Sequence, residues 1–317
     1  MVYINFLVLA LWIVLLVGGS DYFVKSASRI AKRLGVSELV IGLILVANGT
    51  SIPELTVSIF SAIKGHTEII AGNIVGSNIA DLAWIAGLSA LLYGGMKTNK
   101  LILRRDGYMM LFTTIIFFVF ALTGSIKWYM GILFLILYAG YTYFLLKKKH
   151  RGEKHHLKEH LEIKDGLWKD ILIFIISCIA IFIGGKYLVG EIIFIAAFFS
   201  IPETAIGILN AIGTTLPELT VSIIAGRKGM LDLLWGNIIG SNITNILFVV
   251  GASSLISPVE IIKLSSYFTI PFLLGLTILS LIFMRTKWKV SRFEGGILFA
   301  LYLIFLAGLF YLRTGLI

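Results

Sequence analysis

Long apolar runs alternate with short clusters of charged residues from one end of the chain to the other. Most runs are about 20 residues long, the length of helix that crosses the hydrocarbon core of a bilayer. The pattern therefore predicts an all-α polytopic membrane protein. Its ten expected transmembrane helices cover residues 3–24, 38–63, 69–94, 107–125, 128–146, 168–188, 201–225, 232–256, 265–284 and 294–312.

Composition agrees with a chain that lies in a lipid bilayer. Of the 317 residues, 58% are hydrophobic and only 14% are charged, whereas charged residues supply about a quarter of an ordinary soluble domain. The first apolar run lacks a basic leader and a small-residue cleavage site, so we expect a retained helix rather than a signal peptide. The lone cysteine, Cys178, allows no internal disulfide.

Basic residues are divided unequally between the loops that join these spans. The loops after spans one, three, five, seven and nine would share one side of the membrane, and they hold 22 of the 27 lysines and arginines. Cytoplasmic loops carry such an excess, so we expect these loops in the cytoplasm and both termini outside the cell membrane. The net charge of +10 follows from this topology and does not indicate nucleic-acid binding.

The longest polar stretch, Lys147–Gly166, lies at the centre of the chain and contains four of the five histidines. We interpret residues 147–167 as a solvated cytoplasmic linker with a short amphipathic helix. A metal-sensing loop is the alternative that the histidines leave open.

The sequence before this linker repeats after it. ELTVSI at Glu54–Ile59 recurs at Glu218–Ile223, and GNIVGSNI at Gly72–Ile79 recurs as GNIIGSNI at Gly236–Ile243, both at an offset of 164 residues. We therefore expect two five-helix repeats, at 1–146 and 168–317. An odd number of spans inverts the second repeat, and inverted repeats are typical of secondary transporters, whose sites lie where broken helices meet near the midplane.

Both repeats interrupt an apolar helix with glycine, proline and glutamate. Pro53 has no N–H, so the carbonyl of Gly49 loses its helical partner, and in hydrocarbon such a group is tolerated only against protein, water or an ion. A buried carboxylate costs several kcal/mol. Because Glu54 and Glu218 place one at equivalent positions, we predict that both are functional.

Polar side chains recur at helical spacing on the spans that carry and follow these breaks. Residues four apart share one helix face. Two such stripes occur in each repeat: Thr50, Glu54 and Ser58 with Asn73, Ser77 and Asp81, and Thr214, Glu218 and Ser222 with Asn237, Ser241 and Asn245. Converging stripes would offer only oxygen ligands, which suit calcium, sodium or magnesium and disfavour zinc or copper.

Small residues in membrane helices also serve packing. Gly72, Gly76, Gly236 and Gly240 are expected to let a neighbouring backbone approach closely, and for the serines of the stripes a packing role stays open. Asp81 is a buried ionisable group and is predicted to be functional.

At these residues the chain resembles a known family. GTSIPE at 49–54 and GTTLPE at 213–218, each followed by GNxxGSN and then by Asp81 or Asn245, resemble the alpha-repeats of the cation/calcium antiporter superfamily, and most of all prokaryotic sodium/calcium exchangers. The resemblance covers nearly the whole chain. It implies ten helices in two inverted five-helix repeats, with ion sites between helices 2, 3, 7 and 8.

The resemblance also implies a mechanism and a ligand set. Helices 1 and 6 would slide across the core to alternate access, and about three Na⁺ would exchange for each Ca²⁺, moving net charge across the membrane. We expect no enzymatic activity, no resident cofactor and no protein partner. The implied ion ligands are the carbonyls of Ala47 and Ala211 and the side chains of Thr50, Ser51, Glu54, Ser77, Asp81, Thr214, Thr215, Glu218, Ser241 and Asn245.

The two repeats differ in two respects. The spacing from Gly207 to Gly213 is one residue shorter than that from Gly42 to Gly49, so Ala211 enters its break in an altered register. Asp21 in helix 1 is replaced by Lys186 in helix 6, so the two helices expected to slide differ in charge.

Other functions remain as alternatives. A calcium/proton antiporter could use the same carboxylates, although the GNxxE-type motif of the proton-coupled branch is absent. A passive channel needs a continuous pore, for which one pair of inverted repeats supplies no ring. An intramembrane aspartyl protease needs two aspartates, and only Asp81 is deeply placed.

The third carboxylate has no acidic counterpart. With Glu54 and Glu218 ionised around calcium, Asp81 would be an unpaired buried charge, so we expect it to carry a proton in that state. In potassium-dependent exchangers the position of Asn245 is typically Asp, which favours potassium independence.

Overall fold

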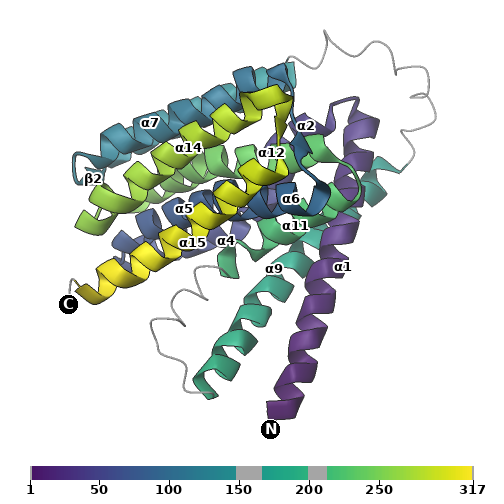
Figure 1. Cartoon of the computed structure of the whole chain (residues 1–317), viewed down its shortest axis with the longest axis horizontal. Helices are drawn as coiled ribbons and strands as arrows, with labels where there is room; N and C mark the ends of the chain where they lie inside the picture. Colours follow the sequence, from purple (N-terminus) through teal and green to yellow (C-terminus); the bar gives the residue numbers. More distant parts are fainter. Residues whose placement is uncertain (1, 148–165, 199–212, 316–317) are drawn as a thin grey trace.

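The computed structural model describes residues 2–147, 166–198 and 213–315, which are helical almost throughout (Figure 1). Within these ranges, seven helices are long and apolar enough to cross a membrane, or eight if the bent pair Glu38–Thr50 and Ile52–Lys64 is one span. Large hydrophobic side chains such as Ile136, Tyr143 and Ile304 are exposed on the outside of the bundle. The protein is therefore a polytopic membrane protein, as the apolar pattern predicts.

The described elements follow the expected order. In the first half they are α1 (Val2–Leu34), α2 (Glu38–Ile41), α3 (Ala47–Thr50), α4 (Ile52–Lys64), α5 (Glu68–Ile79), α6 (Ala86–Tyr93), β1 (Met96–Lys97), α7 (Tyr108–Ala121), β2 (Ser125–Ile126) and α8 (Trp128–Lys147). In the second half they are α9 (Leu167–Phe198), α11 (Leu216–Arg227), α12 (Leu231–Thr244), α13 (Gly251–Ile256), β3 (Val259–Glu260), α14 (Ile270–Arg285), the 3₁₀ turn Thr286–Trp288, β4 (Lys289–Val290) and α15 (Arg292–Gly315).

Several predicted boundaries are wrong. The first helix continues to Leu34 rather than ending at 24, the helix after the linker reaches Phe198 rather than 188, and the helical segment that includes α7 covers 100–121 rather than 107–125. Marking spans at charge clusters ends a helix too early, because long basic side chains stay on a helix and extend their charged ends to the interface.

Within the described ranges, five helical stretches widen into π-helix. They are η1 (Gly42–Val46), η2 (Ala80–Ile85), η3 (Ile102–Gly107), η6 (Asn245–Val250) and η7 (Ser265–Thr269). Four of them form equivalent pairs in the two halves, η2 with η6 and η3 with η7. A π-helical turn shifts the phase of the side chains that follow it and is frequent at functional sites. The apolar pattern did not predict these segments.

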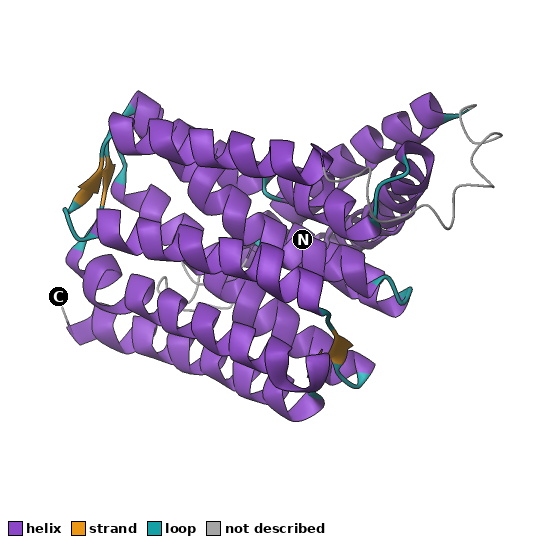
Figure 2. Ribbon diagram, turned by 90° about the horizontal axis from the view of Figure 1, so that it is seen from above, coloured by secondary structure: helices purple, strands orange, loops and turns teal. Residues whose placement is uncertain are grey.

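Two short antiparallel ladders join the halves. Strand β1 pairs with β4, with Met96 opposite Val290, and β2 pairs with β3, with Ser125 opposite Glu260. Figure 2 shows the ladders at opposite ends of the bundle. Each ladder therefore connects a loop of one half to a loop of the other.

Helices α1 and α9 run side by side at a steep angle to the rest of the bundle (Figure 1). Asp170 of α9 is 4% exposed and accepts from Arg29 Nε and Arg33 Nε of α1, both at 2.5 Å. Nearer the N-terminus of α1, Asp21 pairs at 2.7 Å with the Nζ atom of Lys228, which lies just after α11. Ion pairs thus link α1 both to α9 and to the central helices.

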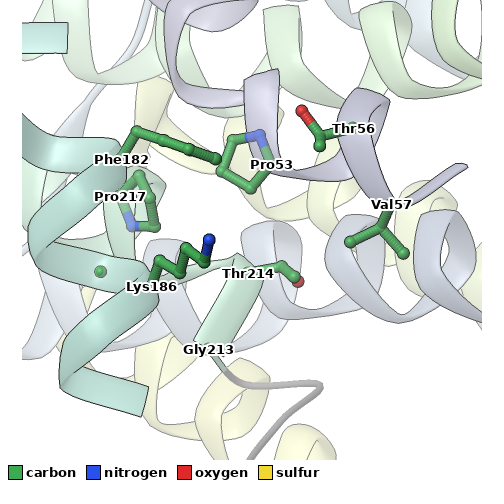
Figure 3. A pocket seen from close by; sticks show the side chains of 9 residues that line it. Pro53, Thr56, Val57, Phe182, Lys186, Gly213, Thr214 and Pro217 are labelled. Carbon is green, nitrogen blue, oxygen red and sulfur yellow. The ribbon is translucent and has the colours of Figure 1, made fainter. Parts of the chain in front are cut away.

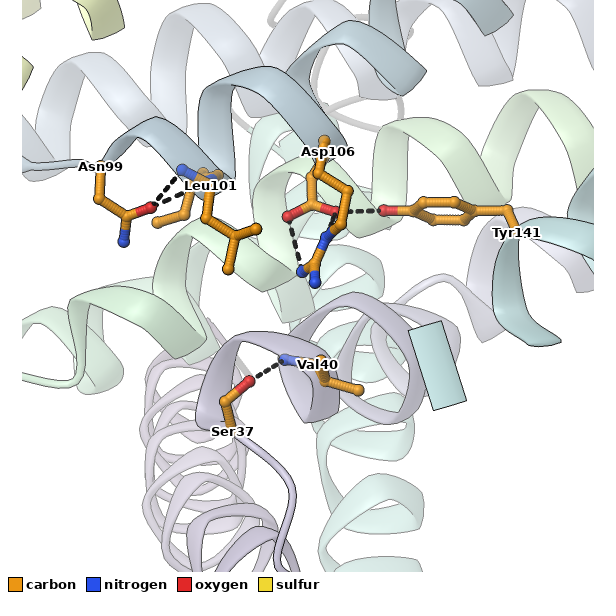
Figure 4. A network of polar contacts seen from close by, with 8 residues as sticks. Ser37, Val40, Asn99, Leu101, Asp106 and Tyr141 are labelled. Carbon is orange, nitrogen blue, oxygen red and sulfur yellow. Dashed lines mark hydrogen bonds and ion pairs between the residues drawn. The ribbon is translucent and has the colours of Figure 1, made fainter. Parts of the chain in front are cut away.

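A polar network fixes the start of the segment that leads into α7 (Figure 4). The buried Asp106 accepts from Arg105 Nε at 2.7 Å and from the Tyr141 hydroxyl of α8 at 2.9 Å. Asn99 Oδ1 accepts from the N–H groups of Leu101 and Ile102, which caps the helix. These contacts hold the peripheral helices in place beside the core.

Candidate functional site

The core helices are broken where the sequence predicts it. Helix α3 ends at Thr50 and α4 begins at Ile52, with a bend of 47° between the two segments. In the second half α11 begins at Leu216, after Thr215. Pro53 and Pro217 occupy the first turns of the new helices, where a missing N–H removes no hydrogen bond.

The freed carbonyl at the first break faces another helix. The Cys178 thiol of α9 donates a long hydrogen bond to the carbonyl oxygen of Gly49, at 3.5 Å. Added to Gly49, a Cβ atom would approach the Phe23 ring of α1 within 3.0 Å. Both helices of the α1 and α9 pair therefore touch the break.

Each glutamate lies in the first turn of the helix after its break, where the helix dipole favours negative charge. Glu54 is fully buried and Glu218 is 2% exposed. Asn73 Nδ2 donates to the Glu54 carbonyl at 3.3 Å, and Asn237 Nδ2 donates to the Glu218 carbonyl at 3.3 Å. The same contact thus orients both glutamates.

Contacts between the halves bring the predicted stripes together. Thr50 Oγ1 donates to Asn237 Oδ1 at 3.0 Å and lies 3.4 Å from Ser241 Oγ. Thr214 lies beside the Glu54 carboxylate, and Ser77 Oγ donates to Glu54 Oε1 at 3.0 Å. The first-half break therefore packs against the second-half helix α12, and the two halves share one polar centre.

The third carboxylate, Asp81, lies at a second contact between the two halves. Asp81, fully buried at the start of η2, accepts from Asn242 Nδ2 at 3.1 Å. At the equivalent crossing, Asn245 Nδ2 at the start of η6 donates to Asn78 Oδ1 at 3.0 Å. The sequence did not single out Asn78 and Asn242, although the repeated GSN motif contains both.

Eight buried oxygen atoms at this centre have no hydrogen-bond partner in the described part of the chain. They are Ser51 Oγ, Glu54 Oε2, Asp81 Oδ1, Thr215 Oγ1, both carboxylate oxygens of Glu218, Asn242 Oδ1 and Asn245 Oδ1. A buried acceptor without a partner costs about 1–3 kcal/mol. Cations that accept oxygen ligands would offset this cost.

The ligand set is mixed rather than purely acidic. In the described ranges, no three histidine, cysteine, aspartate or glutamate side chains gather as a ready metal cluster. Any bound cation would rely on hydroxyl, amide and carbonyl oxygens besides the carboxylates, as calcium and sodium sites allow.

The other predicted positions are accounted for as follows. The Ala47 carbonyl accepts from the Ser51 N–H at 3.0 Å and lies 3.3 Å from Thr50 Oγ1, so it reaches the centre while remaining within its helix. Thr214 is half-buried. Ala211 lies outside the described residues, so its predicted carbonyl contact stays a prediction.

Of the four glycines expected to permit close approach, two are confirmed. A Cβ atom on Gly236 would meet the Leu39 carbonyl oxygen at 2.7 Å, and one on Gly240 would meet the Leu43 carbonyl oxygen at 2.7 Å. For Gly72 and Gly76 no atom of the described residues lies within 4 Å of the added Cβ. In the first half, the segment that contacts Gly236 and Gly240 contains Leu39 and Leu43. Its equivalent in the second half, which would contact Gly72 and Gly76, falls within 199–212, outside the described ranges.

A cavity of about 240 Å³ adjoins the polar centre (Figure 3). It lies between the two break prolines, Pro53 and Pro217, and is closed on one side by Phe182 of α9. Thr214, which lies beside Glu54, also lines it. The cavity therefore lies beside both helix breaks, next to α9.

A sequence model of the family described as "Sodium/calcium exchanger protein" matches residues 4–147 and, a second time, residues 169–311. The chain belongs to the sodium/calcium exchanger family. This family consists of transporters rather than enzymes, and Na⁺ and Ca²⁺ are its substrates.

Relatives of this exchanger family cover the whole length of the chain. The sodium/calcium exchanger MaX1 of Methanosarcina acetivorans is 44% identical over 98% of this chain and 100% of that protein. Inner membrane protein YrbG of Escherichia coli is 31% identical over 96% of each. A solved structure of the sodium-calcium exchanger NCX_Mj, soaked with Na⁺ and Ca²⁺, is 29% identical, covers 97% of this chain and 99% of that chain, and has a TM-score of 0.84.

Proposed function

We propose that this exchanger carries Ca²⁺ and Na⁺ in alternation through the polar centre at the two helix breaks. The observation that carries the proposal is the set of unpartnered buried oxygens contributed by both halves. Calcium accepts irregular oxygen cages, and Na⁺, of similar radius, can compete for the same atoms. The proposed ligands are the twelve residues that the family resemblance implies.

The architecture we propose is ten helices in two inverted five-helix repeats, 1–146 and 168–317, joined by the linker 147–167. The paired ladders support it, because each strand has its counterpart in the other half, about one repeat offset away. Strand β1 corresponds to β3 and β4 corresponds to β2, so the ladder of β1 with β4 is the counterpart of the ladder of β3 with β2. The two matches of the family model, one in each half, support it as well. Both termini would lie outside the cell and the linker in the cytoplasm.

Alternating access would come from movement of α1 and α9 against the central helices. Their mutual ion pairs at Asp170 support a common movement, and the contacts of Cys178 and Phe23 with the Gly49 break support a position of both helices next to the proposed ion site. About three Na⁺ would move for each Ca²⁺, so each cycle would transfer net charge.

Proteoliposomes test the proposed exchange directly. An outward-directed sodium gradient should drive calcium uptake, and the interior should become more negative during uptake. Potassium or proton gradients imposed separately should drive none. Calcium uptake that a proton gradient drives equally well without sodium would replace the proposal by calcium/proton antiport.

A further inference from the structure

One cationic side chain lines the cavity beside the polar centre. Among the described residues lining this cavity, Lys186 of α9 is the only charged one. Figure 3 shows its side chain extending into the cavity towards Pro217 and Thr214. Its Nζ lies 5.6 Å from the Tyr187 ring centroid, and within the described ranges it pairs with no carboxylate.

The Lys186 side chain is exposed at this cavity, so its ammonium group acts on any cation that enters there. Pro53 and Pro217 directly precede the two glutamates, so the route from the cavity to the carboxylates is short. The surrounding walls are mostly apolar, from Val57, Phe182 and the prolines. Beside such apolar walls a charge acts on a nearby ion more strongly than in bulk water.

The equivalent place in the first repeat holds a paired acid instead of a lysine. Asp21 of α1 corresponds to Lys186 and is neutralised by Lys25 Nζ at 2.6 Å and Lys228 Nζ at 2.7 Å. One repeat therefore carries a paired acid at this place, whereas the other carries a lysine in the cavity itself.

We propose that Lys186 is a specificity-determining residue of the exchange, because its charge opposes the entry of calcium more strongly than the entry of sodium. The local concentration of an ion depends exponentially on its charge in a given potential. The factor by which Lys186 lowers local Ca²⁺ is therefore the square of the factor for Na⁺. The inference rests on the proposed sodium/calcium exchange and assigns the relative access of the two ions to one residue.

The test compares half-saturating ion concentrations in right-side-out membrane vesicles. Lys186→Gln should lower the half-saturating Na⁺ concentration about 3-fold and that of Ca²⁺ by the square, about 10-fold. Lys186→Glu should lower both concentrations further, and the factor for Ca²⁺ should again be the square of the factor for Na⁺. Lys186→Arg should match the wild type. The matched control is Lys127→Gln, which removes an exposed charge away from the cavity and should change neither value.

Added salt provides a second measurement. Raising ionic strength with an inert salt should shrink the difference between wild type and Lys186→Gln, because screening weakens the field of the ammonium. Equal factors for the two ions, or values like those of Lys127→Gln, would overturn the inference while exchange itself stands. Absence of sodium-driven calcium uptake in the wild type would instead overturn the proposed function.

Discussion

Glu54 and Glu218 meet matching surroundings. Each follows a helix break, lies in a first helical turn, and has its carbonyl held by an asparagine of the next span. Two negative charges in equivalent settings, one from each half, can face a divalent cation from opposite sides. Asp81 differs, because the other half has Asn245 in its place.

We predict opposite outcomes for the three acids. Glu54→Gln or Glu218→Gln removes a buried negative charge that would attract calcium. The loss costs about 3 kcal/mol or more of binding free energy, which is about 100-fold or more in affinity. Each substitution should therefore abolish exchange. Asp81→Asn should retain measurable exchange with altered sodium or pH dependence, since an amide oxygen can still accept from Asn242. Initial calcium uptake, with and without potassium, distinguishes the variants. Loss of all uptake in Asp81→Asn would make Asp81 an obligatory calcium ligand.

Among the helices, the two breaks before Glu54 and Glu218 could be predicted from the sequence. The side-chain register that the π-helical segments set could not. Proline and glycine within an apolar run have a local cause and a local effect, so both breaks were found. The π-helical segments at Asp81 and Asn245 leave no periodic signal in the sequence of either span alone. For the same reason the sequence did not reveal the crossing of Asn78 with Asn245.

The close approach of the two halves gives an element-scale prediction. Gly236→Ala should separate α12 from α2 and η1, because the new Cβ would lie 2.7 Å from the Leu39 carbonyl oxygen of α2 and 2.8 Å from Gly42 Cα of η1. These are backbone atoms, which cannot rotate away. Overpacking of this kind costs about 1–3 kcal/mol. Thermal unfolding in detergent should show a lower midpoint, together with weaker calcium uptake.

Gly140→Ala is the matched control for this substitution. Gly140 lies on an exposed face of α8 with nothing within 4 Å, so alanine should be neutral or slightly stabilising. Equal unfolding midpoints for the two variants would show that the contact between α2 and α12 tolerates a methyl group.

At the scale of the whole molecule, basic residues gather at one of the two ladders. Lys97, Lys287, Lys289 and Arg292 surround the ladder of β1 with β4, while the ladder of β2 with β3 has Glu260 and Lys127 nearby. The positive-inside rule places the first ladder in the cytoplasm. The fold alone does not determine the orientation of the protein in the membrane, so this orientation is predicted from the distribution of charge.

Cysteine labelling checks this orientation. In a Cys178→Ser background, Gly152→Cys should react only with thiol reagents that reach the cytoplasm, and Ser125→Cys or Ser257→Cys should react from outside. Labelling with an impermeant maleimide on intact cells, against permeabilised cells, makes the comparison. The reverse pattern would overturn the orientation derived from the basic residues.

Binding of radiolabelled calcium to the purified protein tests most directly whether one centre serves both ions. We predict that sodium displaces bound calcium cooperatively, that choline does not, and that Glu54→Gln and Glu218→Gln each lose binding while Asp81→Asn retains it. Calcium that stays bound at saturating sodium, or that binds unchanged to both glutamate variants, would contradict exchange through one shared centre.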